Sequence, residues 1–327
     1  MIRCLPLLLV LCALPALAQK PSATPLPTIA PSATPAAVPM PFLWKVDGPE
    51  ATHYLLGSIH LLPESAHPLP ENLEQAYVAA ERLVLETDPD ALASPEIQQR
   101  FLSAAHREPG TAAQRFGDGL AQKLKAQAQQ SGLPPTVCDA YRAWFCALTL
   151  EIIAFQRAGF EAQYGIDQHF HERGIEDDKS FAFLEPTEQH LALFTGMNPL
   201  DGRTLLAETL DSLEAGSAAA DAPAAMLAAW HADDLRSIEV QTLELRQHAP
   251  AIYARLMRDR NQAWQPQISG YFRSPVPTLV IVGAAHLPGP DGLIATLRAE
   301  GWNLAPVAAP ADEPVAGPAA PANATDP

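Results

Sequence analysis

The sequence has few basic residues and few cysteines, and both shortages narrow the possible functions. Only 21 lysines and arginines stand against 37 aspartates and glutamates in 327 residues, so the formal net charge is −16. Such a chain is a poor candidate for binding nucleic acid or an anionic membrane through general electrostatics. Several familiar motifs are also missing: the sequence has no CxxC pair, no cysteine–histidine zinc pattern, no glycine-rich phosphate loop and no G-x-S-x-G nucleophile elbow.

The two ends of the chain differ in composition from its middle. Residues 1–18 combine one arginine, a short apolar run and a final Ala-Leu-Ala, which predicts a secretory signal peptide. The apolar run is too short to span a bilayer comfortably, so we expect an exported protein, periplasmic or secreted, without a stable membrane span; an uncleaved anchor is the alternative. Residues 19–41 have the composition of a disordered Pro/Ala/Ser/Thr linker, and residues 308–327 that of a disordered Ala/Pro tail. One folded domain, residues 42–307, remains.

The few cysteines limit the disulfides that the mature chain can form. Cys4 and Cys12 leave with the signal peptide, so only Cys138 and Cys146 remain. Within one continuous helix their separation would be roughly 12 Å, too far for a disulfide. A break near Ala140 would allow them to meet, and an oxidising compartment would then join them. The sequence leaves both possibilities open.

Strand-like patterns gather at the two ends of the domain, and helical patterns fill its middle. We expect strands at residues 42–46, 53–59, 82–88, 180–185 and 278–286, with a turn at 47–50 and a last edge strand at 303–307. We expect helices at residues 72–82, 95–106, 111–131, 136–158, 166–173 and 292–300, and over most of 187–269 with breaks at 198–199 and near 223. This order predicts an α/β fold, with a mixed central sheet built from N- and C-terminal strands and a large helical lobe inserted.

Two distant segments repeat one pattern at the end of a strand. In YLLGSIHLLP (Tyr54–Pro63) and VIVGAAHLPG (Val280–Gly289), an apolar run is followed by a glycine and, three residues later, by a histidine. These histidines are His60 and His286. A lone histidine is more often a hydrogen-bonded structural residue, but the repeat favours a shared site. Ligand sites gather beyond the carboxyl ends of parallel strands, so we expect the two segments to be neighbours in one sheet.

Two carboxylates also follow strand-like runs. Glu86 ends the apolar part of RLVLETD and Glu185 ends SFAFLE, where burial of a carboxylate would be costly without a partner. Each could instead be an exposed strand end or the partner of a helix N-terminus. Combined with the two histidines, they form a donor set suited to Mn, Fe, Co or Zn. A metal ion in such a site would polarise a carbonyl and lower the pKa of a bound water.

Other polar residues are weaker candidates. Arg260 and Asn261 are adjacent in MRDRNQAW, where they could stabilise a carboxylate or an oxyanion, although a solvated helix face is the simpler interpretation. His169 and His171 resemble a metal-binding pair, but residues two apart on a helix point to different sides. His67 follows in a proline-rich loop and could approach the site.

Six motifs together resemble the TraB/GumN family, which includes bacterial GumN-like proteins and the animal Tiki proteins. In order they are LWKV…GSIHLLP, LVLETD, YGID, FLEPTEQ, RNQAW and VGAAHLPGPDGL, over about residues 43–301. The resemblance implies an active centre of His60, Glu86 and His286, which would also bind a divalent metal ion (Mn, Co or Zn). It implies supporting roles for Tyr164, Asp167, Glu185, Arg260 and Asn261. Many members have threonine where this chain has Ser58.

The resemblance implies metal-dependent hydrolysis, most simply of a peptide or protein substrate, because Tiki proteins are described as metalloproteases. Two other hypotheses stay open. Erythromycin esterases are wider relatives, which suggests a metal-independent hydrolase with a histidine base. A haem-binding iron-uptake protein is another, which suggests a non-catalytic protein of the cell envelope that binds haem or a partner.

Overall fold

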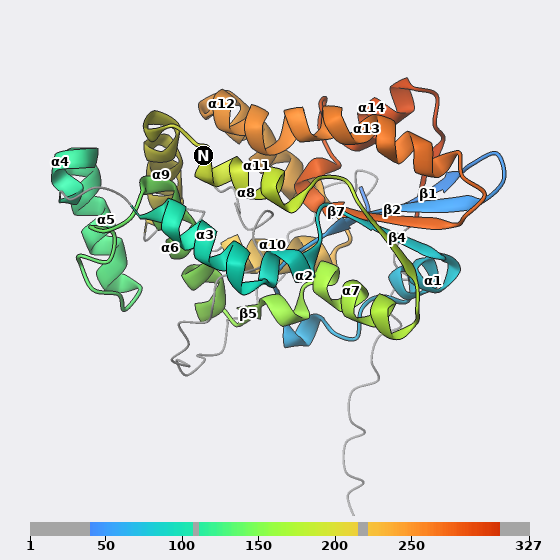
Figure 1. Ribbon diagram of the computed structural model, residues 1–327, viewed down its shortest axis with the longest axis horizontal. Helices are drawn as coiled ribbons and strands as arrows, with labels where there is room; N and C mark the ends of the chain where they lie inside the picture. The colour runs from blue at the N-terminus through green and yellow to red at the C-terminus, as the bar shows by residue number, and fades with distance from the viewer. Residues whose placement is uncertain (1–39, 107–110, 215–221, 308–327) are drawn as a thin grey trace, which may run out of the picture.

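The computed structural model describes residues 40–106, 111–214 and 222–307, and its centre is a six-stranded mixed sheet (Figure 1). The strands, in the order β6-β4-β7-β2-β1-β8, are β6 Ser180–Phe183, β4 Arg82–Leu85, β7 Thr278–Gly283, β2 Thr52–Ser58, β1 Leu43–Asp47 and β8 Leu304–Pro306. The first four run parallel, so their carboxyl ends share one edge of the sheet. The proposed signal peptide, most of the linker and the tail lie outside the described residues.

The sheet joins the two ends of the domain. β1 and β2 form an antiparallel hairpin, and β2 then pairs in parallel with β7, where Ser58 lies opposite Gly283. All six residues of β7 are buried, as expected for an apolar strand in the middle of a covered parallel sheet. The predictions of an α/β fold and of neighbouring G-x-x-H segments are therefore confirmed.

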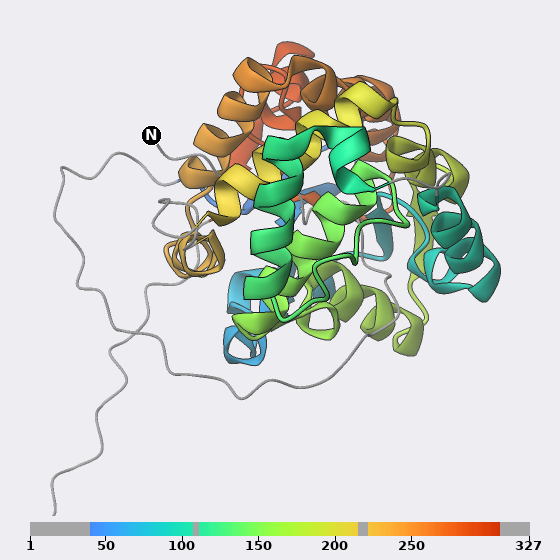
Figure 2. The same ribbon diagram turned by 90° about the vertical axis from the view of Figure 1, so that its left-hand side faces the viewer.

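Helices cover both faces of the sheet and form a lobe at one end (Figures 1 and 2). The helices against the sheet are α1 Glu71–Ala79, α7 Ile166–Glu176, α13 Asp259–Phe272 and α14 Leu293–Ala299. The others are α2 Pro89–Ala93, α3 Pro95–Ala105, α4 Ala112–Phe116, α5 Asp118–Gln130, α6 Ala143–Arg157, α8 Thr187–Thr195, α9 Pro199–Leu213, α10 Ala222–His231, α11 Arg236–His248 and α12 Pro250–Tyr253. In the described ranges no helix has the length and apolarity needed to cross a membrane.

Short elements complete the chain. Two-residue strands β3 Leu62–Pro63 and β5 Phe160–Glu161 pair with each other, and 3₁₀ turns lie at η2 Glu64–Ala66, η3 Ala162–Tyr164 and η5 Ala284–His286. A π-helical turn, η4 Ala254–Arg258, leads into α13. Such turns occur often at functional sites.

Two predicted helices are shorter than expected, and the reasons are local. The helix expected at residues 111–131 is broken at Gly117, whose φ of 83° ends α4 before α5 begins. That backbone conformation is one that glycine adopts without steric cost. The helix expected at residues 136–158 begins only at Ala143, and residues 136–140 form turns instead. The predictions for both segments were therefore wrong in their continuity.

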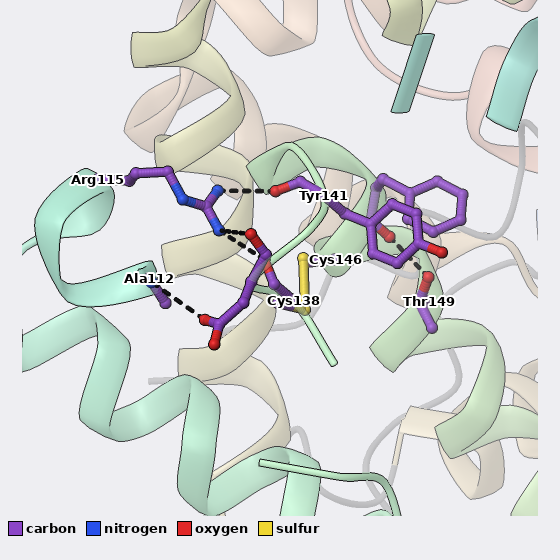
Figure 3. Close-up of a disulfide and its surroundings, with 8 residues drawn as sticks. Ala112, Arg115, Cys138, Tyr141, Cys146 and Thr149 are labelled. Atoms are coloured by element: carbon purple, nitrogen blue, oxygen red, sulfur yellow. Dashed lines mark hydrogen bonds between the residues drawn. A yellow bond between two sulfur atoms is a disulfide. The ribbon is translucent and has the colours of Figure 1, made fainter. Parts of the chain in front are cut away.

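The turns before α6 bring Cys138 and Cys146 together. Their Cα atoms lie 5.9 Å apart and the sulfurs form a disulfide (Figure 3). Arg115 holds the turn by donating to the carbonyl oxygens of Cys138 at 2.6 Å and Tyr141 at 2.7 Å. The possibility that the sequence left open, a break near Ala140 with a disulfide across it, is the one that the structure shows.

Removal of this disulfide should destabilise the lobe measurably. We expect the Cys138→Ser/Cys146→Ser double variant to lose roughly 2 to 3 kcal/mol of unfolding free energy, because the short closed loop no longer restricts the unfolded chain. Urea unfolding followed by far-ultraviolet circular dichroism measures the loss. A reducing agent should destabilise the wild type by a similar amount and leave the double variant unchanged; equal sensitivity of both proteins would contradict the prediction.

Candidate functional site

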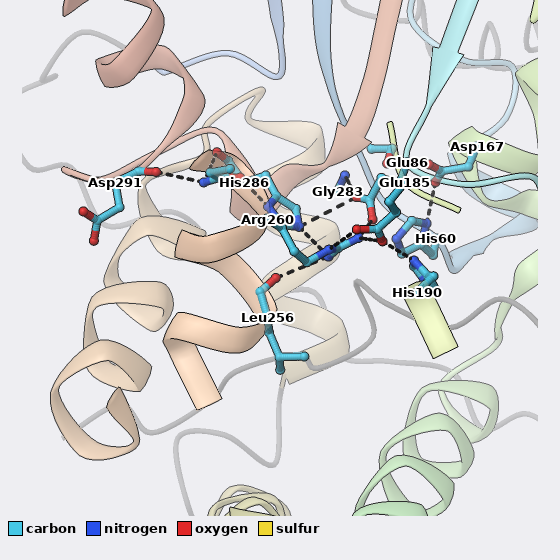
Figure 4. Close-up of polar contacts among 12 residues, drawn as sticks. His60, Glu86, Asp167, Glu185, His190, Leu256, Arg260, Gly283, His286 and Asp291 are labelled. Atoms are coloured by element: carbon cyan, nitrogen blue, oxygen red, sulfur yellow. Dashed lines mark hydrogen bonds and ion pairs between the residues drawn. The ribbon is translucent and has the colours of Figure 1, made fainter. Parts of the chain in front are cut away.

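Four side chains that follow parallel strands meet at one edge of the sheet. Across that edge, Glu185 follows β6, Glu86 follows β4, His286 follows β7 and His60 follows β2 (Figure 4). The backbone links two of them directly, because the N–H of Glu185 donates to the carbonyl of Glu86 at 2.9 Å. The two histidines and two glutamates thus lie at the same edge of the sheet, as predicted from the strand ends.

Arg260, from the first turn of α13, lies in the middle of this group. Its Nη2 donates to both carboxylates, to Oε2 of Glu86 and to Oε1 of Glu185 at 2.8 Å, and its Nε donates to the other oxygen of Glu185 at 3.2 Å. Its Nη1 donates to Nε2 of His286 at 2.9 Å. The side chain is 2% exposed, so it is a buried cation that connects three of the strand-end residues.

His286 uses both ring nitrogens for hydrogen bonds within the protein. Arginine has no acceptor, so Nε2 of His286 must accept from Arg260, and the proton is on Nδ1. Nδ1 then donates to Oδ1 of Asn261 at 2.6 Å. Trp264 packs against both groups, with its ring centroid 4.3 Å from the guanidinium and 4.6 Å from the imidazole centroid. His286 is therefore fixed as a neutral acceptor for Arg260.

His60 forms a separate pair with Asp167 of α7. Its Nδ1 lies 2.6 Å from Oδ2 of Asp167, whose other oxygen accepts from the hydroxyl of Ser58 at 2.8 Å. Gly165 makes this approach possible, because a Cβ there would lie 2.2 Å from the carbonyl oxygen of His60. The YGID motif therefore brings a carboxylate against the first G-x-x-H motif.

The carboxylates of the site are held in their ionised forms. Burial alone would raise the pKa of Glu86 and that of Glu185, but the guanidinium of Arg260 and neighbouring imidazoles lower both below their usual range. Burial would also raise the pKa of Asp167, and the adjacent His60 imidazole lowers it. Three buried carboxylates thus accompany a single guanidinium, which leaves an excess of negative charge when the neighbouring imidazoles are neutral.

Acid should destabilise the protein through His286. Burial, followed by the charge of Arg260, lowers the pKa of His286 from 6.5 to about 3. Between these two pKa values the unfolded chain binds a proton that the folded chain does not. The free energy of unfolding therefore decreases by roughly 1.4 kcal/mol for each pH unit by which the solution is made more acidic. This contribution is fully present above pH 6.5, and urea unfolding at several pH values between 7 and 4.5 measures its loss.

The His286→Gln variant is the control for that slope. It removes the titrating ring, so its unfolding free energy should be lower at pH 7 but should fall less steeply between pH 6.5 and 4.5. Parallel pH profiles of the two proteins would show that another group causes the acid sensitivity.

One residue of the site was missed in the sequence. His190, one turn into α8, lies with Nδ1 2.7 Å from Oε1 of Glu185. The signal was present in FLEPTEQH, because Pro186 starts a helix directly after the strand-end glutamate and so folds the next histidine back over it.

Two expected participants lie elsewhere. The carbonyl of Tyr164 is 2.9 Å from Nε2 of His67, and the two rings lie 5.9 Å apart, so they contact each other rather than Glu86. His67 also contacts His169 edge-on, whereas His171 packs against Phe181, as expected for residues two apart that point to different sides of a helix.

The structure groups ligand atoms that could bind a metal ion. Glu86, Glu185 and His190 each offer one such atom, and these atoms all lie within 4.8 Å of one another. Two carboxylates and an imidazole suit a borderline divalent cation, and the excess negative charge favours one. His60 and His286, expected as ligands beside Glu86, belong to neighbouring hydrogen-bonded pairs, and His286 has no ring nitrogen left for a metal in this arrangement.

Three hollows border the site. His60, Glu86, Asp167 and His190 line a small cavity of about 40 Å³. Two larger and more open hollows, of about 600 and 380 Å³, share Gln189 in their walls; the first also includes Glu185 and the second includes Arg260.

Comparison with known proteins identifies the family of the chain. A family model described as the TraB/PrgY/gumN family matches residues 42–306. The chain is 26% identical over 245 residues to proteins named "Uncharacterized protein YbaP" in Escherichia coli (strain K12) and in Shigella flexneri, with 75% of this chain and 87% of each relative covered. No solved structure matches. Since the family model spans nearly all of the described residues, the chain belongs to the TraB/PrgY/gumN family.

Proposed function

We propose that the protein is an exported metal-dependent hydrolase that cleaves peptide bonds at the cluster of Glu86, Glu185, His190 and Arg260. The observation that carries the proposal is the buried charge. Three ionised carboxylates, Asp167 included, lie with one guanidinium in and beside this cluster, and three ligand atoms lie within 4.8 Å of one another. A bound divalent cation would balance this charge and supply Lewis acidity toward a carbonyl.

The protein groups would act around that cation in distinct ways. Glu86, Glu185 and His190 would hold it, and Arg260 would keep the two glutamates in position from the opposite side. His60 would move the proton of the attacking water, because Asp167 accepts from Nδ1 and so leaves Nε2 as the basic atom of the ring. The two open hollows that share Gln189, one lined by Glu185 and the other by Arg260, support an extended substrate that lies along the cluster.

Two further observations bear on where the protein acts. The disulfide between Cys138 and Cys146 is typical of an oxidising compartment, which supports export to the periplasm or the medium. The signal-like N-terminus suggests the same route. Haem binding receives no specific support, because the cavity lined by His60 and His190 is about 40 Å³, whereas small-molecule sites are typically about 300 Å³ or more.

The decisive experiment compares metal-free and metal-restored protein. Untagged mature chain is treated with a chelator, dialysed and assayed on a peptide library with Mn²⁺, Co²⁺ or Zn²⁺ added back. We expect cleavage only with a cation, and we expect Glu185→Gln to weaken cation affinity at least about 10-fold. Glu188→Gln is the matched control, since Glu188 pairs with Arg100 at the surface. Failure to cleave with any cation would exclude the metal-dependent peptidase.

A metal-independent hydrolase is the second candidate, and the His60–Asp167–Ser58 arrangement favours it. A carboxylate that orients an imidazole is the usual form of a histidine general base, with or without a metal. Arg260 bound to both glutamates also balances part of their charge without any ion. Cleavage that persists in chelator but disappears in His60→Ala would select this candidate.

A further inference from the structure

A second group of possible ligands lies outside the site described above. Asp88, Asp90 and His171 each offer a ligand atom, and these atoms lie within 4.8 Å of one another. The two aspartates are at the start of α2, and His171 is in the middle of α7, which lies beside α2 in Figure 1. No role in the proposed hydrolysis uses any of the three.

His171 is the residue that points to a ligand. Its side chain is 4% exposed, its Nδ1 is buried without a hydrogen bond, and its Nε2, which faces Asp90, makes no hydrogen bond within the described part of the chain. Phe181 packs against the ring, with centroids 5.1 Å apart. A buried imidazole that makes no hydrogen bond is costly, so a ligand on Nε2, the nitrogen that faces Asp90, would recover part of that cost.

The distances fit a cation between the side chains. Nε2 of His171 is 4.0 Å from Oδ2 of Asp90, which is too long for a hydrogen bond. Two zinc–ligand bonds of about 2.0–2.2 Å each span such a gap. Asp88 uses Oδ1 to cap α2, accepting from the N–H groups of Asp90 and Ala91, and its other oxygen makes no hydrogen bond within the described ranges. Asp90 is exposed, which gives an ion access from solvent.

We propose that Asp88, Asp90 and His171 bind one divalent transition-metal ion, with Zn²⁺ the best match. Two carboxylate oxygens and one imidazole nitrogen form a common zinc donor set, and water would complete the coordination. Calcium is a poorer match, because it prefers six to eight oxygen ligands.

The bound ion would join two walls of the small cavity. Pro89 and Leu92 of α2 lie on one side of that cavity and Gln168 of α7 on another, next to the Asp167 that holds His60. A metal that connects α2 to α7 would therefore fix the distance between these walls. It acts as a clamp and does not take part in bond cleavage.

Zinc titration of the untagged full chain by calorimetry, with zinc content measured after dialysis, tests the proposal. Among the zinc ions bound, we expect one whose affinity falls at least about 10-fold in Asp90→Asn and in His171→Asn. Glu172→Gln, an exposed acid next to His171, should bind zinc as the wild type does. Asp90 is exposed, so its variant should fold even if replacement of the buried His171 reduces stability.

The same titration separates this site from the proposed catalytic one. Glu185→Gln should weaken the binding of a zinc ion at the proposed catalytic site. It should leave unchanged the binding of the zinc ion that depends on Asp90. The melting temperature should rise with zinc in wild type and Glu172→Gln, and less in Asp90→Asn. Absence of zinc binding by the wild type, or identical zinc affinity and content in wild type, Asp90→Asn and His171→Asn, would overturn the proposal.

Discussion

Replacement of Arg260 with methionine should destabilise the fold by about 3 to 5 kcal/mol at pH 7, the typical cost of leaving buried charges without their partner. Arg260 is the guanidinium that both Glu86 and Glu185 contact, and all three side chains are at most 5% exposed. Arg260→Lys should recover only part of the loss, because an ammonium cannot contact both carboxylates and His286 in one plane. Urea unfolding of the three proteins measures these differences.

The pH dependence and a surface control make this prediction specific. Without the arginine the pKa of each glutamate should rise, so the unfolding free energy that Arg260→Met loses at pH 7 should be smaller at pH 5, where the carboxyls can be protonated. Arg258→Met is the control, since Arg258 pairs with Asp259 at the surface and its loss should change stability by less than about 0.5 kcal/mol. Equal effects of the two substitutions would contradict the buried network.

Replacement of His60 with alanine should lower kcat/KM about 10²- to 10⁴-fold, the range that general acid–base groups contribute. Asp167→Asn should have an effect of similar size, because an amide can hold the ring in the wrong tautomer and cannot stabilise its charged form. Initial rates on the peptide identified in the metal-restoration assay provide the measurement. Circular dichroism should show that both variants remain folded.

Two further variants distinguish a role in chemistry from a general effect of losing an imidazole. His231→Ala removes an exposed histidine at the end of α10 and should leave kcat/KM unchanged. Ser58→Thr keeps the hydroxyl that donates to Asp167, so it should retain activity, whereas Ser58→Ala should reduce it. Full activity of His60→Ala would remove His60 from the mechanism under either candidate function.

Local sequence patterns were enough for much of the fold. The apolar run at β7 and the hairpin of β1 and β2 have strand periodicity, and they were predicted close to their observed bounds. Helix continuity was harder, because the break at Gly117 and the turns before Ala143 depend on single backbone angles and on hydrogen bonds from Arg115. Such contacts link residues more than twenty positions apart, which no local pattern records.

The sequence by itself determined which groups would be at the strand ends: the two G-x-x-H histidines and the glutamates that close LVLE and FLE. Side-chain alternation and the glycine spacing are local properties, and they survive in the folded protein. Only the tertiary structure decided how these groups pair. Arg260 reaches the glutamates from a helix more than seventy residues further along the chain. It donates hydrogen bonds to both glutamates and to His286, and Glu86 lies close to Glu185 and His190. A buried charged side chain pairs with the opposite charge that is nearest to it in the folded protein, because burial of an unpaired charge is costly. The sequence alone does not give these distances.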